Sequence, residues 1–150
     1  MLSDKEKKFF ETKIKNVSST NQKISILLNE KLRSDLKNIK KIKTNLKYNI
    51  KKCDNILYLY NVADDMWFLA GDKSTDYNFY TKRIILSSIL SKLYIKILTT
   101  KSYNDDLLSQ DVNIEISKVG KFNKLKSDLL SLLNNIKNFT NKDRKSKRGY

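Results

Sequence analysis

The chain contains no histidine and no proline, and it has only three glycines and one cysteine among its 150 residues. Lack of histidine removes the commonest general base and metal-ligating side chain. So few helix-breaking residues favour a mostly helical domain. The single cysteine, Cys53, cannot form an internal disulfide bond, which fits a reducing cytoplasm. No apolar run approaches the roughly 20 residues that span a bilayer. The first six residues lack a signal-peptide or transit pattern, so we expect no leader.

Enzymatic chemistry is not expected. Gly71 stands alone, without the glycine-rich loop that cradles phosphates. Four carboxylates lie close together in the sequence and could hold Mg²⁺ or Ca²⁺. Two of them, Asp72 and Asp76, flank a turn before a helix, where carboxylates cap free N–H groups. We favour capping, and we predict no catalytic residue, metal or cofactor. The four carboxylates are Asp64, Asp65, Asp72 and Asp76.

The formal net charge of +15 is unevenly distributed along the chain. Residues 1–52 carry 15 basic and 5 acidic side chains, residues 53–100 carry 5 of each, and residues 101–150 carry 11 and 6. Basic flanks can attract nucleic acid or an anionic membrane surface. Codon bias in an A+T-rich genome would also produce this wealth of lysine, asparagine and isoleucine. Both explanations stay open.

Apolar residues at three- and four-residue steps predict a series of amphipathic helices. A capping box formed by Ser3 and Glu6 begins the first helix, which runs to about residue 17. Helical periodicity then covers residues 24–50. The next helix ends at Gly71, a residue suited to the left-handed position after a helix. Its predicted apolar stripe consists of Ile56, Leu59, Tyr60, Ala63, Trp67 and Ala70.

Two later segments have unusual apolar patterns. The helix predicted over residues 77–100 is apolar on most sides, which indicates burial or a shared interface, and we expect a homodimer through residues 81–100, with Ile89 at the contact. After a helix over residues 107–119, residues 127–139 form an amphipathic helix followed by a basic tail. This composition suits an anionic membrane surface, although an ordinary docking helix fits as well. The expected membrane contacts are Leu129, Leu130, Leu133, Ile136 and Phe139.

The segment from Ala63 to Arg83, ADDMWFLAGDKSTDYNFYTKR, resembles the COQ-nine family of ubiquinone-biosynthesis accessory proteins. The family pattern is approximately DxxW at a helix end followed by AGDxSTDFNWYTKR, and Phe79 stands where tryptophan is usual. Weaker similarity extends over about residues 23–126. The matching residues are Asp64, Trp67, Ala70, Gly71, Asp72, Ser74, Thr75, Asp76, Asn78, Tyr80, Thr81, Lys82 and Arg83.

This resemblance implies an all-α, TetR-like helical domain over residues 1–126, with the N-terminal DNA-binding-type unit reduced or missing, and a separate segment over residues 127–150. It also implies a dimeric, non-catalytic protein that binds an isoprenoid quinone or phospholipid. Such a protein presents quinone intermediates to the demethoxyubiquinone hydroxylase at the membrane surface. We therefore expect a cytoplasmic protein, peripheral on the inner membrane. The alternative is a TetR-like DNA-binding regulator, but no helix pair presents side chains suited to base edges.

The resemblance also assigns candidate site residues. The family's exposed partner patch maps to residues 76–80, and we expect Asp76, Phe79 and Tyr80 to bind the hydroxylase. Aromatic side chains beside a carboxylate are typical of interface hot spots. The alternative is that Phe79 and Tyr80 only begin the core of the following helix. The lipid contacts are predicted at Tyr60, Trp67, Ile85, Ile89 and Leu93.

Overall fold

Local signals in the sequence set the ends of the helices. The computed structural model describes residues 1–40, 42, 44, 54–75 and 77–119, and every regular element in these ranges is an α-helix. Helix α1 (Asp4–Ile14) begins at the predicted capping box. The Ser3 hydroxyl accepts from the Glu6 N–H, and the Glu6 carboxylate accepts from the Ser3 N–H at 2.8 Å. The all-α fold class is confirmed for the described residues.

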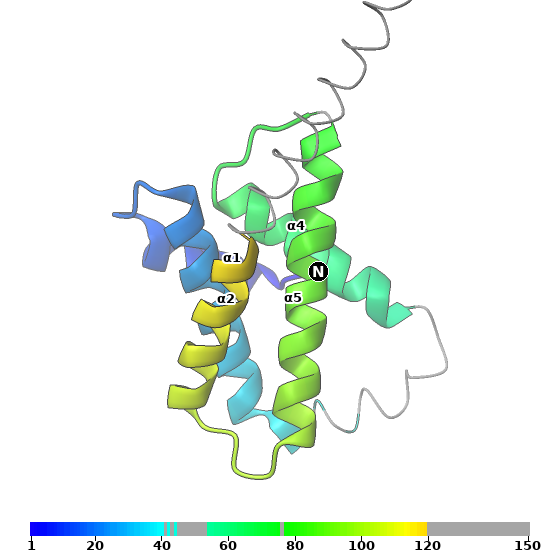
Figure 1. The fold of residues 1–150 in the computed structure, drawn as a ribbon. Helices are drawn as coiled ribbons and strands as arrows, with labels where there is room; N and C mark the ends of the chain where they lie inside the picture. Colours follow the sequence, from blue (N-terminus) through cyan, green and yellow to red (C-terminus); the bar gives the residue numbers. More distant parts are fainter. Residues whose placement is uncertain (41, 43, 45–53, 76, 120–150) are drawn as a thin grey trace, which may run out of the picture. The chain divides into compact units, whose positions relative to one another are not determined.

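The core forms where the helices pack against one another (Figure 1). α2 (Thr20–Lys37) contacts α1, α4 (Asp54–Leu69) and α5 (Tyr77–Thr99), and α4 packs along α5. Residues 105–119 are helical as predicted. The fully buried side chains are mainly aliphatic, so burial of apolar surface is the main stabilising contribution. The largest of them are Phe10, Leu27, Leu28, Leu32, Met66, Leu90, Leu93 and Leu108.

The apolar stripe predicted for α4 is partly wrong. Ala63 and Ala70 are buried, but Ile56 is 75% exposed. The buried residues of this helix lie in its second half, where Asp65 meets the N-terminal segment and Asp64 meets α5. Periodicity identifies the face of a helix that is apolar, but it does not say how far along that face a neighbouring helix reaches.

A buried lysine joins three helices. Lys31 of α2 donates to Glu6 of α1 at 2.8 Å and to Asp35 at 3.1 Å. Asp35 also accepts a hydrogen bond from the Tyr94 hydroxyl of α5. Burial alone would raise the pKa of Glu6, but hydrogen bonds from Lys31 and Ser3 outweigh it and lower that pKa to about 2. The cluster is satisfied internally, which is the condition under which burial of charge is tolerated.

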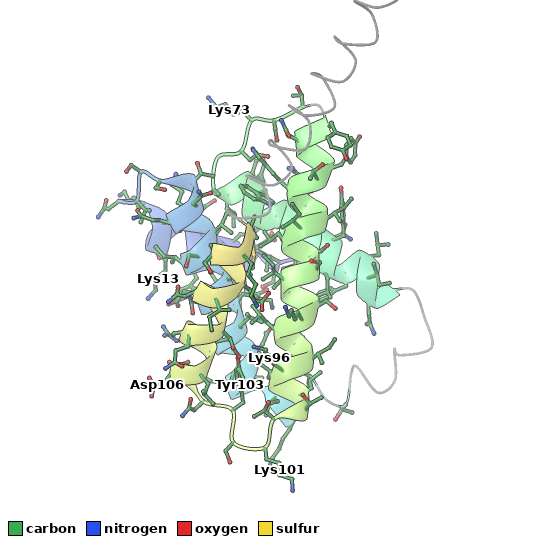
Figure 2. All side chains as sticks on the ribbon, in the orientation of Figure 1. Lys13, Lys73, Lys96, Lys101, Tyr103 and Asp106 are labelled. Atoms are coloured by element: carbon green, nitrogen blue, oxygen red, sulfur yellow. The ribbon has the colours of Figure 1, made fainter. Side chains whose placement is uncertain are left out.

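The helix over residues 105–119 is also attached by charged groups. Asp111 accepts from Lys96 of α5 at 2.6 Å and from the Tyr103 hydroxyl at 2.8 Å. Figure 2 shows Lys96 and Tyr103 beside each other, where the end of α5 turns toward this helix. Lys92 forms a second link to Glu115 at 2.9 Å. Leu108 and Val112 of this helix are also fully buried, so ion pairs and apolar burial together hold the helix in place.

The chain divides into two compact units, Met1–Ile116 and Ser117–Tyr150. Helices α1, α2, α4 and α5 belong to the first unit, and of the second unit only residues 117–119, the end of the helix over residues 105–119, are described. The predicted boundary at residues 126 and 127 lies outside the described residues and stays a prediction. Within the described part of the chain, none of the helices is both long and apolar enough to span a bilayer.

Gly71 ends α4 in the predicted left-handed conformation, with φ of +83°. Its N–H donates to the Phe68 carbonyl at 3.0 Å, and the Asp72 N–H donates to the Trp67 carbonyl at 3.0 Å. This pair of bonds is a Schellman motif, which satisfies the carbonyl groups left free at a helix end. The motif also holds the backbone of Asp72 against the last turn of α4.

Replacing Gly71 with alanine should lower the free energy of unfolding by about 1 kcal/mol, because a Cβ atom disfavours the left-handed region. Nothing lies within 4 Å of the added Cβ, so steric collision contributes nothing. Urea denaturation followed by circular dichroism measures the change. A Gly71→Asn variant should lose less, since asparagine tolerates this conformation better. Equal stability of the alanine variant and the unaltered protein would contradict the assignment.

Candidate functional site

A buried carboxylate organises the connection between α4 and α5. The Asp72 side chain is 4% exposed and accepts from Lys82 at 2.6 Å, Ser74 at 2.6 Å and Arg83 at 3.2 Å. Burial by itself raises the pKa of Asp72, but these three hydrogen bonds outweigh it and lower the pKa to about 2. We refer to Asp72, Ser74, Lys82, Arg83 and Asp64 as the Asp72 cluster.

Arg83 connects the cluster to both helices. Its buried guanidinium donates through Nε to Asp64 of α4 and through Nη1 to Asp72. Nη1 also donates to the Phe79 carbonyl at 3.0 Å, and the Phe79 ring lies 3.3 Å from the guanidinium carbon. A planar cation with several donors suits such a site, because it stacks and forms ion pairs at once.

Three of the four clustered carboxylates form ion pairs with basic side chains. Asp65 accepts from the Leu2 N–H at 2.7 Å and pairs with Lys7 at 2.8 Å. Asp64 and Asp72 pair with basic side chains of α5. Among the described residues no three candidate ligands gather where they could hold a metal ion. The carboxylate oxygens of Asp72 accept hydrogen bonds from Lys82, Ser74 and Arg83, and its capping role stays a prediction.

Trp67 belongs to this connection as well. Its indole N–H donates to the Lys82 carbonyl at 3.1 Å, and the Lys82 ammonium lies 5.2 Å from the centre of the indole ring. The tryptophan is half-buried. Its contacts join α4 to α5, whereas the sequence suggested a lipid contact, which stays a prediction.

The aromatic residues at the start of α5 are largely presented to solvent. Tyr80 is 59% exposed, Tyr77 is exposed and Phe79 is half-buried. The rings of Phe79 and Tyr80 meet edge to face, with centroids 5.1 Å apart and an interplanar angle of 77°. Phe79 therefore has an internal partner in Arg83, while Tyr80 extends outward. Asp76, the third residue predicted for this patch, lies outside the described residues.

The residues predicted to bind lipid occupy different environments. Tyr60 and Ile85 are half-buried, whereas Leu93 is fully buried and Ile89 is 7% exposed. Leu93 and Ile89 belong to the packed core of the chain itself. The predicted membrane contacts Leu129, Leu130, Leu133, Ile136 and Phe139 lie outside the described residues.

From the sequence, Lys82 and Arg83 are only matches to the family pattern, and Asp64 is only a match and a possible cation ligand. The signal was nevertheless present, because two carboxylates before the turn face two adjacent basic residues after it. The packing of α4 against α5 brings these groups together. The Lys31 and Asp35 pair has the four-residue spacing of a helical ion pair, whereas the pairing of Lys31 with Glu6, 25 residues away, had no comparable signal.

Comparisons with known proteins cover the same part of the chain. Residues 53–123, just under half of the chain, match the COQ9 family model. This segment is therefore similar to proteins of the COQ9 family. A Bos taurus protein named ubiquinone biosynthesis protein COQ9, mitochondrial, is 48% identical over 44 residues, which are 29% of this chain and 13% of the relative. Rattus norvegicus and Homo sapiens proteins of the same name are 55% identical over 31 residues, which are 21% of this chain and 10% of each relative.

The resemblance to the COQ-nine family is thus confirmed, although the matched segments span only about a tenth of the length of these curated relatives. No solved structure matches the chain, so the TetR-like arrangement stays a prediction. The COQ9 segment contains α4, the Asp72 cluster, α5 and the helix over residues 105–119. Helices α1 and α2 precede it in the chain and pack against α4.

Proposed function

We propose that this COQ9-family protein is a non-catalytic accessory protein of ubiquinone biosynthesis. It binds an isoprenoid quinone or a phospholipid and presents quinone intermediates to the demethoxyubiquinone hydroxylase at a membrane surface. The observation that carries this proposal is the coincidence of the COQ9 match with an exposed aromatic surface on a buried ionic support. The names of the relatives link such proteins to ubiquinone biosynthesis in mitochondria.

The motif contains buried residues that join the two helices and an exposed aromatic residue, and this difference supports a partner surface at the start of α5. Asp72 and Arg83 are buried and hold the two helices together. Tyr80 is more than half exposed, so fold stability does not account for its ring. Tyrosine supplies large contact area at low conformational cost and is enriched at interface hot spots. Phe79 has a contact of its own inside the chain, so it both supports this surface and contributes to it.

A Tyr80→Ala variant should keep the melting temperature of the unaltered protein within about 2 °C, because substitutions of exposed residues change stability little. Its affinity for the hydroxylase should fall roughly 30-fold, as expected for truncation of a hot spot of about 2 kcal/mol. Thermal melts and titration of labelled hydroxylase measure the two quantities. The matched control is Tyr103→Phe. Tyr103 lies in the loop after the other end of α5, so this change should leave binding unchanged. An unfolded Tyr80→Ala protein would instead assign the ring to the core.

Lipid binding and membrane attachment need separate tests. Extraction of the purified protein into organic solvent, followed by mass spectrometry, should recover an isoprenoid or a phospholipid. Salt-sensitive retention on duplex DNA without lipid would favour the DNA-binding alternative. For the segment 127–150, we propose reversible peripheral attachment to the anionic surface of an inner membrane. Full-length protein should float with acidic vesicles more than a version ending at Lys126, and equal flotation would contradict that role.

Dimerisation through α5 is also a proposal, and the structure changes the residues that would carry it. Ile89 faces the chain's own core. On the opposite side of α5, four residues are exposed at four- and seven-residue steps: Tyr80, Ile84, Ser88 and Ile95. Such steps place these residues along one stripe of a helix. The large apolar arc of this helix therefore consists of a core face and an outer stripe, and only the stripe is accessible to a second copy.

A further inference from the structure

We infer that Arg83 is a positioning residue that orients Tyr80 for binding, an inference that rests on the proposed function. Arg83 itself is 3% exposed and cannot form the main contact with a partner. It lies one helical turn from Phe79 on α5, and its side chain returns over that turn. The effect of Arg83 on a partner must therefore pass through Phe79 and Tyr80.

The first part of this path is the attachment of α5 to α4. Asp64 and Asp72 both precede the turn, and both bind the same guanidinium. The two carboxylates hold opposite parts of the guanidinium, Nε and Nη1, so the plane of the group is set from two directions. Lys82 and Ser74 occupy other positions around Asp72, which keeps that carboxylate in place. The guanidinium is therefore a fixed platform in the packed unit.

The second part is the contact of the fixed guanidinium with Phe79, whose ring in turn contacts Tyr80. Nη1 donates to the Phe79 carbonyl at 3.0 Å, and the guanidinium carbon lies 3.3 Å from the centre of the Phe79 ring. The face of that ring is therefore held, while its neighbour Tyr80 meets it in a T-shaped contact at 5.1 Å. This contact restricts the rotamers of an exposed side chain that would otherwise move freely. Ordering a side chain before binding removes part of the entropic cost of association.

An Arg83→Lys change would keep the positive charge but would remove the planar guanidinium that stacks on Phe79. An ammonium group is a point donor without a plane, so it cannot stack on Phe79 while binding Asp64 and Asp72. Immobilising one side chain typically costs 0.5–1.5 kcal/mol, so loss of this preorganisation should weaken hydroxylase binding roughly 3- to 10-fold. Because the effect passes through Tyr80, it should disappear when that ring is absent.

The test is a double-mutant cycle read by hydroxylase titration, with Arg83→Lys, Tyr80→Ala and the combination. Arg83→Lys should weaken binding in the unaltered background and leave affinity unchanged in the Tyr80→Ala background. The matched control is Lys96→Gln, which removes an α5 cation from its carboxylate partner Asp111 and touches neither Asp72 nor Phe79. It should lower the melting temperature without changing the affinity of the folded protein.

The outcomes separate this inference from the proposed function. If Tyr80→Ala weakens binding but Arg83→Lys does not, or weakens it equally in both backgrounds, Arg83 is only structural and the inference is overturned. If Tyr80→Ala itself binds normally, the proposed partner surface is wrong and the inference falls with it. Should Arg83→Lys not fold, Phe79→Leu takes its place in the same cycle, because it removes the stacked ring and spares the ion pairs. Phe79→Leu should likewise weaken hydroxylase binding in the unaltered background and leave the affinity unchanged in the Tyr80→Ala background.

Discussion

Replacing Asp72 with asparagine should lower the free energy of unfolding by about 3 kcal/mol, because removal of one member of a buried ion pair leaves the other buried without compensation. Asp72 and Arg83 each have side chains that are 4% exposed. After the change, Arg83 keeps Asp64 as its one ionic partner among the described residues, and Lys82 loses its carboxylate at 2.6 Å. Urea denaturation of the two proteins at neutral pH measures the difference.

The matched control for this change is Asp64→Asn. Asp64 binds the same arginine, but its side chain is 48% exposed, so solvent can replace much of its contribution. We expect a loss below about 1 kcal/mol for this variant. Comparable losses at the two positions would show that burial does not govern the strength of the cluster, and the role assigned to Asp72 would be wrong.

The same carboxylate should be visible in the acid dependence of stability. The pKa of Asp72 is about 2 in the folded protein, against an ordinary value of 3.8. A group whose pKa is lowered by folding stabilises the fold above its unfolded pKa. This contribution is therefore complete above about pH 4 and is lost as pH falls from 3.8 toward 2. Glu6 acts in the same direction between 4.5 and about 2, so Asp72→Asn should reduce the acid-induced loss without abolishing it.

Replacing Ile89 with lysine should lower the free energy of unfolding by roughly 4 kcal/mol, enough to unfold much of the protein, since an unpaired charge would enter the core. Ile89 is 7% exposed, and its neighbours on the same face of α5 include the fully buried Leu90 and Leu93. Circular dichroism and sedimentation velocity should show loss of helix and aggregation. A stable, fully helical Ile89→Lys protein would contradict the packing of α5.

Ile84→Lys is the control, and it also tests self-association. Ile84 is 58% exposed on the outer stripe of α5, so the change should alter stability by no more than about 0.5 kcal/mol. If two copies meet through this stripe, the folded variant should sediment as a monomer under conditions in which the unaltered protein is a dimer. An unchanged dimer would place the interface elsewhere, and the comparison with Ile89→Lys separates a broken interface from a broken core.

The helix ends could be read from the sequence because they depend on neighbouring residues. Ser3 and Glu6 form the capping box that their spacing predicted, and Gly71 has the positive φ expected after a helix. α5 spans Tyr77–Thr99, close to the predicted range of 77–100. In each case the deciding interaction lies within one or two helical turns, where spacing along the chain is spacing in space.

Burial could not be read so directly. The predicted core residue Ile56 is exposed, while Val62 and Met66, which were absent from the predicted stripe, are fully buried. On α5 the apolar residues surround most of the helix, so periodicity alone did not separate Ile84, which is exposed, from Leu90, which is buried. Where apolar residues occur on every side, the choice of face depends on the neighbouring helices.

The sequence by itself determined the all-α character of the described residues, the position of the turn at Gly71 and the segment that is similar to COQ9, because local spacing and a dense motif carry that information. Only the tertiary structure decided which motif residues are buried in the fold and which are exposed to solvent. Asp72 and Arg83 became buried partners when α4 and α5 packed together, and the same packing left Tyr80 exposed. The physical reason is that burial and charge pairing depend on contacts between segments, which a linear pattern does not contain.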